Sequence, residues 1–213
     1  MNYQTIFFDL DDTLYSKESG VWQAVRARIE MYMHERLGIP WADIPALRNE
    51  YLQNYGTTLR GLSTRYQIDV DDYLVYVHDV PIEDMIPANP GLAEMLARLP
   101  QRKWVFTNAS LAHARRVLSA LGISTQFDGI LDIHAMAYHS KPDAGVYRLA
   151  LETAGERQAS HSLFIDDRWA NLEPAKKMGA GTVLVGNSEP HPAADRSIAR
   201  VEDLLVALPS LVE

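Results

Sequence analysis

Strand-like and helical stretches alternate along most of this chain, and this alternation constrains the fold more than any other feature. Apolar runs typical of buried strands occupy residues 3–9, 103–107, 129–133, 162–166 and 182–185. Helical patterns lie at 91–99, 111–121, 144–154 and 170–178, and a glycine directly follows each of the last three. Strands separated by helices pair in parallel through right-handed crossovers. The sequence therefore predicts an α/β fold with a doubly wound, Rossmann-like parallel sheet.

The segment between the first two strands has a different texture. Apolar residues recur at helical spacing over 22–37, 47–55 and 70–77, and no strand pattern interrupts them. The stretch 55–62 carries a glycine and polar residues, and it is predicted to be a turn between two helices. We expect an inserted α-helical cap subdomain over residues 16–87, with the α/β core formed by 1–15 and 88–213.

Composition excludes several classes of protein. The 213 residues are 47% hydrophobic and 23% charged, as in an ordinary globular protein, and the net charge of −8 without a basic block argues against nucleic acid as a partner. Cysteine is absent, so there are no disulfides and no thiolate chemistry. No apolar run of about 18 residues and no signal-like leader is present, so we expect no membrane partner and a cytoplasmic location.

The first strand ends abruptly in the sequence Asp9-Leu-Asp-Asp-Thr13. Clustered carboxylates repel one another and are costly to bury, so a strand has no structural reason to end in this way. A solvated Asp-rich turn is one explanation. A bound cation and a phosphoryl group are the other, and the spacing of Asp9 and Asp11 places both carboxylates on one side of an extended chain.

Polar residues also follow the other central strands. They are Thr107 and Asn108 after the second strand, Lys141 in the loop before the 144–154 helix, and Asp166 and Asp167 after the fourth strand. Taken singly, these residues have ordinary explanations as helix caps or a solvated lysine. In a doubly wound sheet, however, they converge on one crevice at the carboxyl ends of the strands. The sequence therefore predicts a single active site there.

This ordered set resembles the haloacid dehalogenase superfamily of phosphohydrolases with a C1 helical cap. The DxDx[TV] motif of that family matches Asp9–Thr13, its Ser/Thr motif matches Thr107, its lysine motif matches Lys141, and its terminal acidic motif matches Asp166-Asp167. A closer similarity, to the pyrimidine 5′-nucleotidase subfamily, rests on the stretches 8–15, 55–62, 106–109 and 113–118. Relatives often carry Asn or Gly where this chain has Asp12, which we interpret as a spectator.

The Asp-rich set, without cysteine or a histidine cluster, suits Mg²⁺. The resemblance implies that Asp9 and Asp167 are side-chain ligands, that Asp11 contributes its backbone carbonyl, and that Asp166 assists. It also implies that Asp9 is the nucleophile, which forms a phospho-aspartyl intermediate, and that Asp11 is the general acid and base. Lys141 would supply a fixed positive charge beside the Asp9 carboxylate.

The substrate is expected to be a small phosphorylated metabolite, and by resemblance a pyrimidine nucleoside 5′-monophosphate. Thr107 is the fourth implied catalytic residue, beside Asp9, Asp11 and Lys141, and its hydroxyl would donate to a phosphate oxygen. The implied substrate-binding residues are Thr13 and Asn108 in the core and Thr57, Thr58 and Arg60 in the cap. The seven histidines are scattered without metal-ligand spacing, so surface or core roles are favoured for them. The aromatic residues of the cap are interpreted as subdomain core rather than as a base-stacking platform.

Other enzymatic functions could use the same core residues. A phosphatase of a sugar or cofactor phosphate, or a phosphoglucomutase, would differ only in the cap. Dehalogenation is disfavoured because it needs no Mg²⁺ and no acid at Asp11, and phosphonate cleavage because Lys17 is the only lysine before residue 103. A phosphoacceptor signalling domain would have another motif order and no helical insertion. The expected assembly is a monomer or homodimer.

Overall fold

The core of the computed structural model, which describes residues 3–212, is a six-stranded sheet in the order β3-β2-β1-β4-β5-β6. The strands are β1 (Thr5–Phe8), β2 (Arg102–Phe106), β3 (Gly129–Leu131), β4 (Ser162–Asp166), β5 (Gly181–Val185) and β6 (Arg196–Ile198). Every neighbouring pair is parallel. The strand order reverses between β1 and β4, and such a reversal opens a crevice at the carboxyl ends of the strands. The predicted fold class is confirmed.

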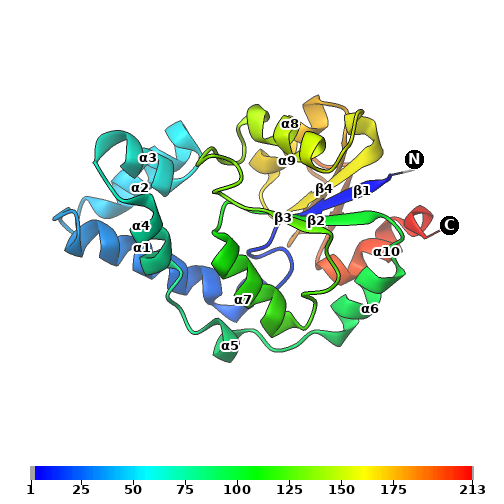
Figure 1. The fold of residues 1–213 in the computed structure, drawn as a ribbon, viewed down its shortest axis with the longest axis horizontal. Helices are drawn as coiled ribbons and strands as arrows, with labels where there is room; N and C mark the ends of the chain where they lie inside the picture. Colours follow the sequence, from blue (N-terminus) through cyan, green and yellow to red (C-terminus); the bar gives the residue numbers. More distant parts are fainter. Residues whose placement is uncertain (1–2, 213) are drawn as a thin grey trace.

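Helices cover both faces of this sheet (Figure 1). One face carries α8 (Ala144–Thr153) and α9 (Trp169–Lys177), and the other carries α6 (Pro90–Arg98), α7 (Leu111–Leu121) and α10 (Leu204–Ala207). Short 3₁₀ helices occupy Lys17–Ser19, Ala159–His161, Val201–Asp203 and Pro209–Leu211. The core helices α6, α7, α8 and α9 begin and end within one residue of the predicted bounds, because capping residues mark most of these ends in the sequence. None of the helices over residues 3–212 combines the length and apolar character needed to cross a membrane.

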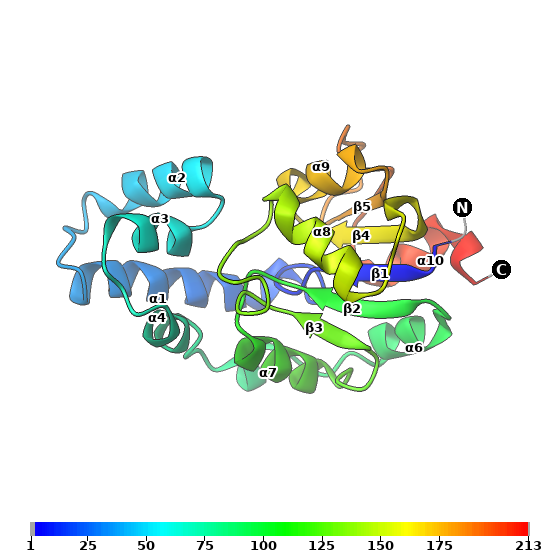
Figure 2. The same ribbon diagram turned by 45° about the horizontal axis from the view of Figure 1, so that its top comes forward.

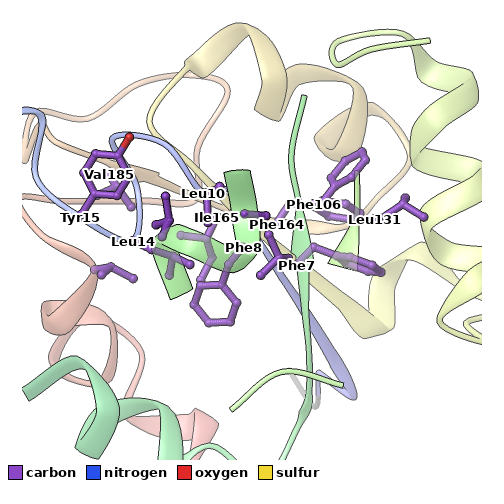
Figure 3. Close-up of a cluster of buried hydrophobic side chains, with 14 of the residues drawn as sticks. Phe7, Phe8, Leu10, Leu14, Tyr15, Phe106, Leu131, Phe164, Ile165 and Val185 are labelled. Atoms are coloured by element: carbon purple, nitrogen blue, oxygen red, sulfur yellow. The ribbon is translucent and has the colours of Figure 1, made fainter. Parts of the chain in front are cut away.

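The central strand β1 organises the apolar core (Figure 3). All of its residues are buried, which explains why it is a continuous apolar run rather than an alternating one. The ring of Phe7 stacks on Phe164 of β4 at 4.6 Å between centroids and meets Phe106 of β2 edge-on at 6.2 Å. This packing holds the carboxyl ends of β1, β2 and β4 in fixed relation to one another.

The inserted segment forms a separate group of helices beyond the carboxyl ends of the strands (Figure 2). It contains α1 (Val21–Glu35), α2 (Ile44–Tyr55), α3 (Thr58–Arg65) and α4 (Val70–Val77). The chain then returns through the short helix α5 (Ile82–Met85), which packs against α7 of the core. An inserted helical cap agrees with the sequence analysis, and its bounds of 16–87 remain a prediction.

The prediction of a polar turn over residues 55–62 was wrong. Only Gly56 and Thr57 separate α2 from α3, because Gly56 ends α2 at φ +81° and the Thr57 hydroxyl accepts a hydrogen bond from the backbone N–H of Arg60. Leu59 and Leu62 then bury their side chains in the cap. Two apolar residues in eight are too few for a helical period to stand out in the sequence. Tertiary packing therefore decides this element.

Candidate active site

A cleft of about 480 Å³ separates the cap from the carboxyl ends of the strands. Its core side is formed by Asp9, Asp11, Asp12, Thr107, Asn108, Ala109, Lys141, Asp167, Arg168 and Asn171. Its cap side includes apolar residues, among them Val25, Ile29, Leu52, Leu59, Leu74 and Val77, together with Arg48, Asn49, Thr57 and Thr58. The polar residues that the sequence places after separate strands therefore share one cleft with the cap above them.

Lys141 is the centre of the site. Its ammonium donates to Asp9 Oδ1 and to Asp166 Oδ2, both at 2.7 Å, and the residue is only 2% exposed. The Nζ atom also lies 5.1 Å from the centroid of the Phe106 ring. Burial alone lowers the pKa of Lys141, but the two carboxylates outweigh burial and raise the pKa above its usual value. Lys141 therefore carries a fixed positive charge next to Asp9.

Asp166 orients this lysine. Asn171 on α9 donates from Nδ2 to both Asp166 oxygens at 2.9 and 3.1 Å, and the backbone N–H of Arg168 donates to Oδ1 at 2.9 Å. With Lys141 on Oδ2, both carboxylate oxygens of Asp166 have protein partners. The position of Lys141 is therefore set by β4 and the start of α9.

Three carboxylates meet on the floor of the cleft. One oxygen each from Asp9, Asp166 and Asp167 lie within 4.8 Å of one another. Burial, with the neighbouring carboxylates, raises the pKa of Asp9 to about 7 and that of Asp167 to about 8. Lys141 alone thus leaves negative charge in excess. A hard cation with oxygen ligands fits this donor set, and Mg²⁺ is the ion that one or two carboxylates and a substrate phosphate usually hold.

Two loop residues from the sequence prediction support the site through neighbouring side chains. Thr13 is buried, and its hydroxyl donates to Asp9 Oδ2 at 3.2 Å. The Asn108 amide bonds the backbone of Lys141 twice, accepting from its N–H at 2.8 Å and donating to its carbonyl at 3.2 Å. The family resemblance predicts that both residues bind substrate. Their observed contacts hold the carboxylate and the lysine loop in place.

Thr107 lies on the cleft wall at the end of β2. Its Oγ1 accepts a hydrogen bond from the backbone N–H of Ala109 at 3.0 Å, and the side chain is 1% exposed. The hydroxyl hydrogen has no acceptor among residues 3–212. A donor in this position is suited to an anionic oxygen in the cleft.

Asp11 has two partners that sequence reasoning did not find. His113 Nε2 and the Tyr15 hydroxyl both lie 2.7 Å from Asp11 Oδ1, and since a carboxylate only accepts, both of them donate. Burial alone raises the pKa of Asp11, but the interactions with His113 and Tyr15 outweigh it and hold the pKa at about 2. His113 occupies the buried stripe of α7 with Ala114 and Val117, so a histidine within an apolar helical face was the available signal.

Asp12 adopts the left-handed conformation, with φ +58°. Few residue types tolerate this region, and Asn, Asp and Gly are the common ones. Burial and the neighbouring Asp11 raise the pKa of Asp12 to about 6. The left-handed backbone thus explains why relatives often carry Asn or Gly at this position.

The cap residues predicted to contact substrate differ in their surroundings. Thr57 and Thr58 line the cleft. Arg60 instead reaches the core and pairs with Asp143 at 3.4 Å, outside the residues that line the cleft. Arg48, which was not predicted, lines the cleft with its side chain 8% exposed and pairs with Glu30 at 2.8 Å.

The chain belongs to the haloacid dehalogenase-like hydrolase family, whose sequence model matches residues 3–179. The predicted family membership is confirmed. Phosphate metabolism protein 8 of Saccharomyces cerevisiae is 31% identical over 195 residues, which cover 85% of this chain and 61% of the yeast protein. The chain thus spans less than two thirds of that relative.

Two solved structures share the fold over nearly their whole length. CbbY from Rhodobacter sphaeroides in complex with phosphate is 21% identical, with a TM-score of 0.71 over 98% of this chain and 99% of that one. The hydrolase YfnB of Bacillus subtilis, bound to magnesium, is 17% identical, with a TM-score of 0.64 over 97% and 98%. At these identities the similarity is one of fold.

Proposed function

We propose that this protein is a Mg²⁺-dependent phosphate monoester hydrolase that acts through a phospho-aspartyl intermediate. The observation that carries this proposal is the ammonium of Lys141, fixed between Asp9 and Asp166 at 2.7 Å from each, within an acidic cluster that Asp167 completes. Family membership and the phosphate-bound CbbY structure support it. The proposal gives Asp9, Asp11, Thr107 and Lys141 the roles that the family resemblance implies.

Asp9 would attack phosphorus and form the P–O bond of the intermediate, while Asp11 gives a proton to the departing alkoxide oxygen. Asp11 would then remove a proton from water, which attacks phosphorus and releases phosphate from Asp9. Mg²⁺, held by Asp9, Asp167 and the Asp11 carbonyl, with Asp166 assisting, would neutralise negative charge on the phosphoryl group. Lys141 and Thr107 would bind its remaining oxygens.

We propose a pyrimidine nucleoside 5′-monophosphate as the substrate. The support is the sequence resemblance together with a cleft whose cap side combines apolar walls with polar ends, an arrangement suited to the faces and edges of a nucleobase. Thr57 and Thr58 would contact the leaving group as predicted, and Arg48 would contact it as well. Arg60 would act in closing the cap, through its pair with Asp143.

Phosphate release tests both parts of the proposal. The purified protein is assayed with UMP, CMP, ribose 5-phosphate and p-nitrophenyl phosphate, in Mg²⁺ and in EDTA. We expect turnover only with Mg²⁺, and loss of about 10⁴-fold or more in Asp9→Asn. The matched control Asp12→Asn removes a carboxylate from the same loop and keeps activity. Full turnover by Asp9→Asn would refute the mechanism.

The ranking of substrates tests the pyrimidine preference separately. UMP and CMP should exceed ribose 5-phosphate in kcat/KM, because only they fill the cap side of the cleft. Equal values would remove the nucleotide assignment and leave the phosphatase class in place.

A further inference from the structure

We propose that His113 and Tyr15 are positioning residues that anchor Asp11 by one carboxylate oxygen and present the other oxygen to the substrate. The inference rests on the proposed function, in which Asp11 is the general acid and base. It concerns side chains that are not among the residues lining the cleft.

The hydrogen bonds of Asp11 are one-sided. Both donors bond Oδ1 at 2.7 Å, whereas Oδ2 accepts no hydrogen bond from the described residues. The Asp11 side chain is 18% exposed and lines the cleft, while that of His113 is 0% exposed. Two anchors on one oxygen fix the rotation of the carboxylate, and Oδ2 is the oxygen left for exchange with the cleft.

His113 is itself held from behind. The ring of His78, which directly follows α4 at the start of the linker from the cap back to the core, stacks on the His113 ring at 4.3 Å between centroids and 26° between planes. Ser110 Oγ lies 3.1 Å from His78 Nδ1, and Arg116 Nη1 donates to the His78 carbonyl at 3.1 Å. The anchor of Asp11 is therefore built jointly by α7 and the cap linker.

The chemistry assigns one oxygen to each task. Asp11 is a carboxylate in the free site, and the complex that reacts is the one in which Oδ2 has taken up a proton. Oδ2 gives this proton to the leaving oxygen as the P–O bond breaks, and the proton lost by the attacking water later returns to Oδ2. Oδ1 accepts from His113 and Tyr15 throughout, so the carboxylate does not turn between the two steps. Misplacement of a catalytic group by about 1 Å can cost about 10²-fold in rate.

Leaving-group dependence separates this role from a general structural one. Nitrophenolate leaves as a stable anion without a proton, whereas the alkoxide of UMP requires one. The value of kcat/KM reports the steps up to the first irreversible one, which include departure of the leaving group. If UMP is not a substrate, ribose 5-phosphate serves as the alkyl ester, so the test does not depend on the pyrimidine preference.

Four variants are compared on both esters in Mg²⁺. His113→Phe keeps a ring against His78 and removes the donor, and His113→Gln restores a donor. Tyr15→Phe removes only a hydroxyl, and Tyr51→Phe removes a buried hydroxyl of the cap that makes no contact with Asp11. We expect His113→Phe to lower kcat/KM for the alkyl ester by about 10- to 100-fold and for p-nitrophenyl phosphate by less than about threefold.

His113→Gln should recover most of the loss, Tyr15→Phe should show a smaller loss of the same selectivity, and Tyr51→Phe should match the wild type. Equal losses on both esters, or no loss on either, would overturn the inference. Tyr15→Phe decides the question if the His113 variants fail to fold. Absence of turnover by the wild-type protein on every ester is a different outcome, which refutes the proposed function and this inference with it.

Discussion

Replacement of Lys141 by Met should destabilise the protein strongly. The substitution keeps most of the volume and removes the charge that bonds Asp9 and Asp166 at 2.7 Å each in a site where Lys141 is 2% exposed. Removing one partner of a buried ion pair costs about 3–5 kcal/mol, because the remaining charge stays desolvated. For a chain of this size that corresponds to a fall in Tm of about 6–20 °C.

The loss of unfolding free energy in Lys141→Met should be larger at alkaline pH than in acid. The pKa of Asp9 is about 7 and that of Asp167 about 8, above the value of an unfolded aspartate, and loss of Lys141 raises that of Asp9 further. A carboxyl with a raised folded-state pKa stabilises the fold in acid, and this contribution is lost as pH rises through that pKa. The destabilisation of Lys141→Met at about pH 5.5 should therefore be about half of that at about pH 8.5.

Urea unfolding followed by circular dichroism, in EDTA, measures both effects. Lys177→Met is the matched control, because Lys177 is 76% exposed and pairs with Glu173 within one helix. This control should change the free energy of unfolding by less than about 0.5 kcal/mol. A loss below about 1 kcal/mol in Lys141→Met at about pH 8.5, or a loss that grows in acid, would refute the reasoning.

Three further predictions concern stability. Mg²⁺ should raise Tm more at about pH 8.5 than at about pH 6, because protons occupy Asp9 and Asp167 in acid; equal shifts in thermal unfolding would contradict this. Asp12→Asn should stabilise by about 1 kcal/mol at about pH 8 and by little below its pKa of about 6, measured by urea unfolding. Gly61→Ala should cost about 1–3 kcal/mol, since its Cβ would lie 2.3 Å from Tyr51, and a neutral result would refute that clash.

The sequence predicted the sheet and the meeting of polar residues on the floor of the cleft because both depend on local signals. Buried parallel strands appear as continuous apolar runs, and the polar residues that follow Phe8, Phe106 and Ile165 must meet at one edge once the strands pair. Strand β6 escaped prediction because only Ile198 of its residues Arg196–Ile198 is apolar and buried, so no apolar run marks it in the sequence. Short edge elements of this kind depend on their neighbours.

The partners of Asp11 could not be derived because their encounter is not local. His113 lies 102 residues further along the chain, and its contact with Asp11 depends on how α7 packs beside β1. Arg60 was expected at the leaving group, but the structure places it against Asp143 of the core. This pairing depends on the angle at which the cap meets the core. Such pairings require the tertiary arrangement.

The position of β1 has a consequence for how the chain is made. This strand is synthesised before both of its partners, because it pairs with residues 102–105 on one side and 162–165 on the other. During translation its buried residues Ile6, Phe7 and Phe8 must wait until β4 has left the ribosome, while the cap helices between them form from local contacts. A nascent chain stalled before residue 162 would carry a formed cap and a β1 strand that lacks its β4 partner, and an apolar strand with an open edge is the kind of segment that chaperones bind.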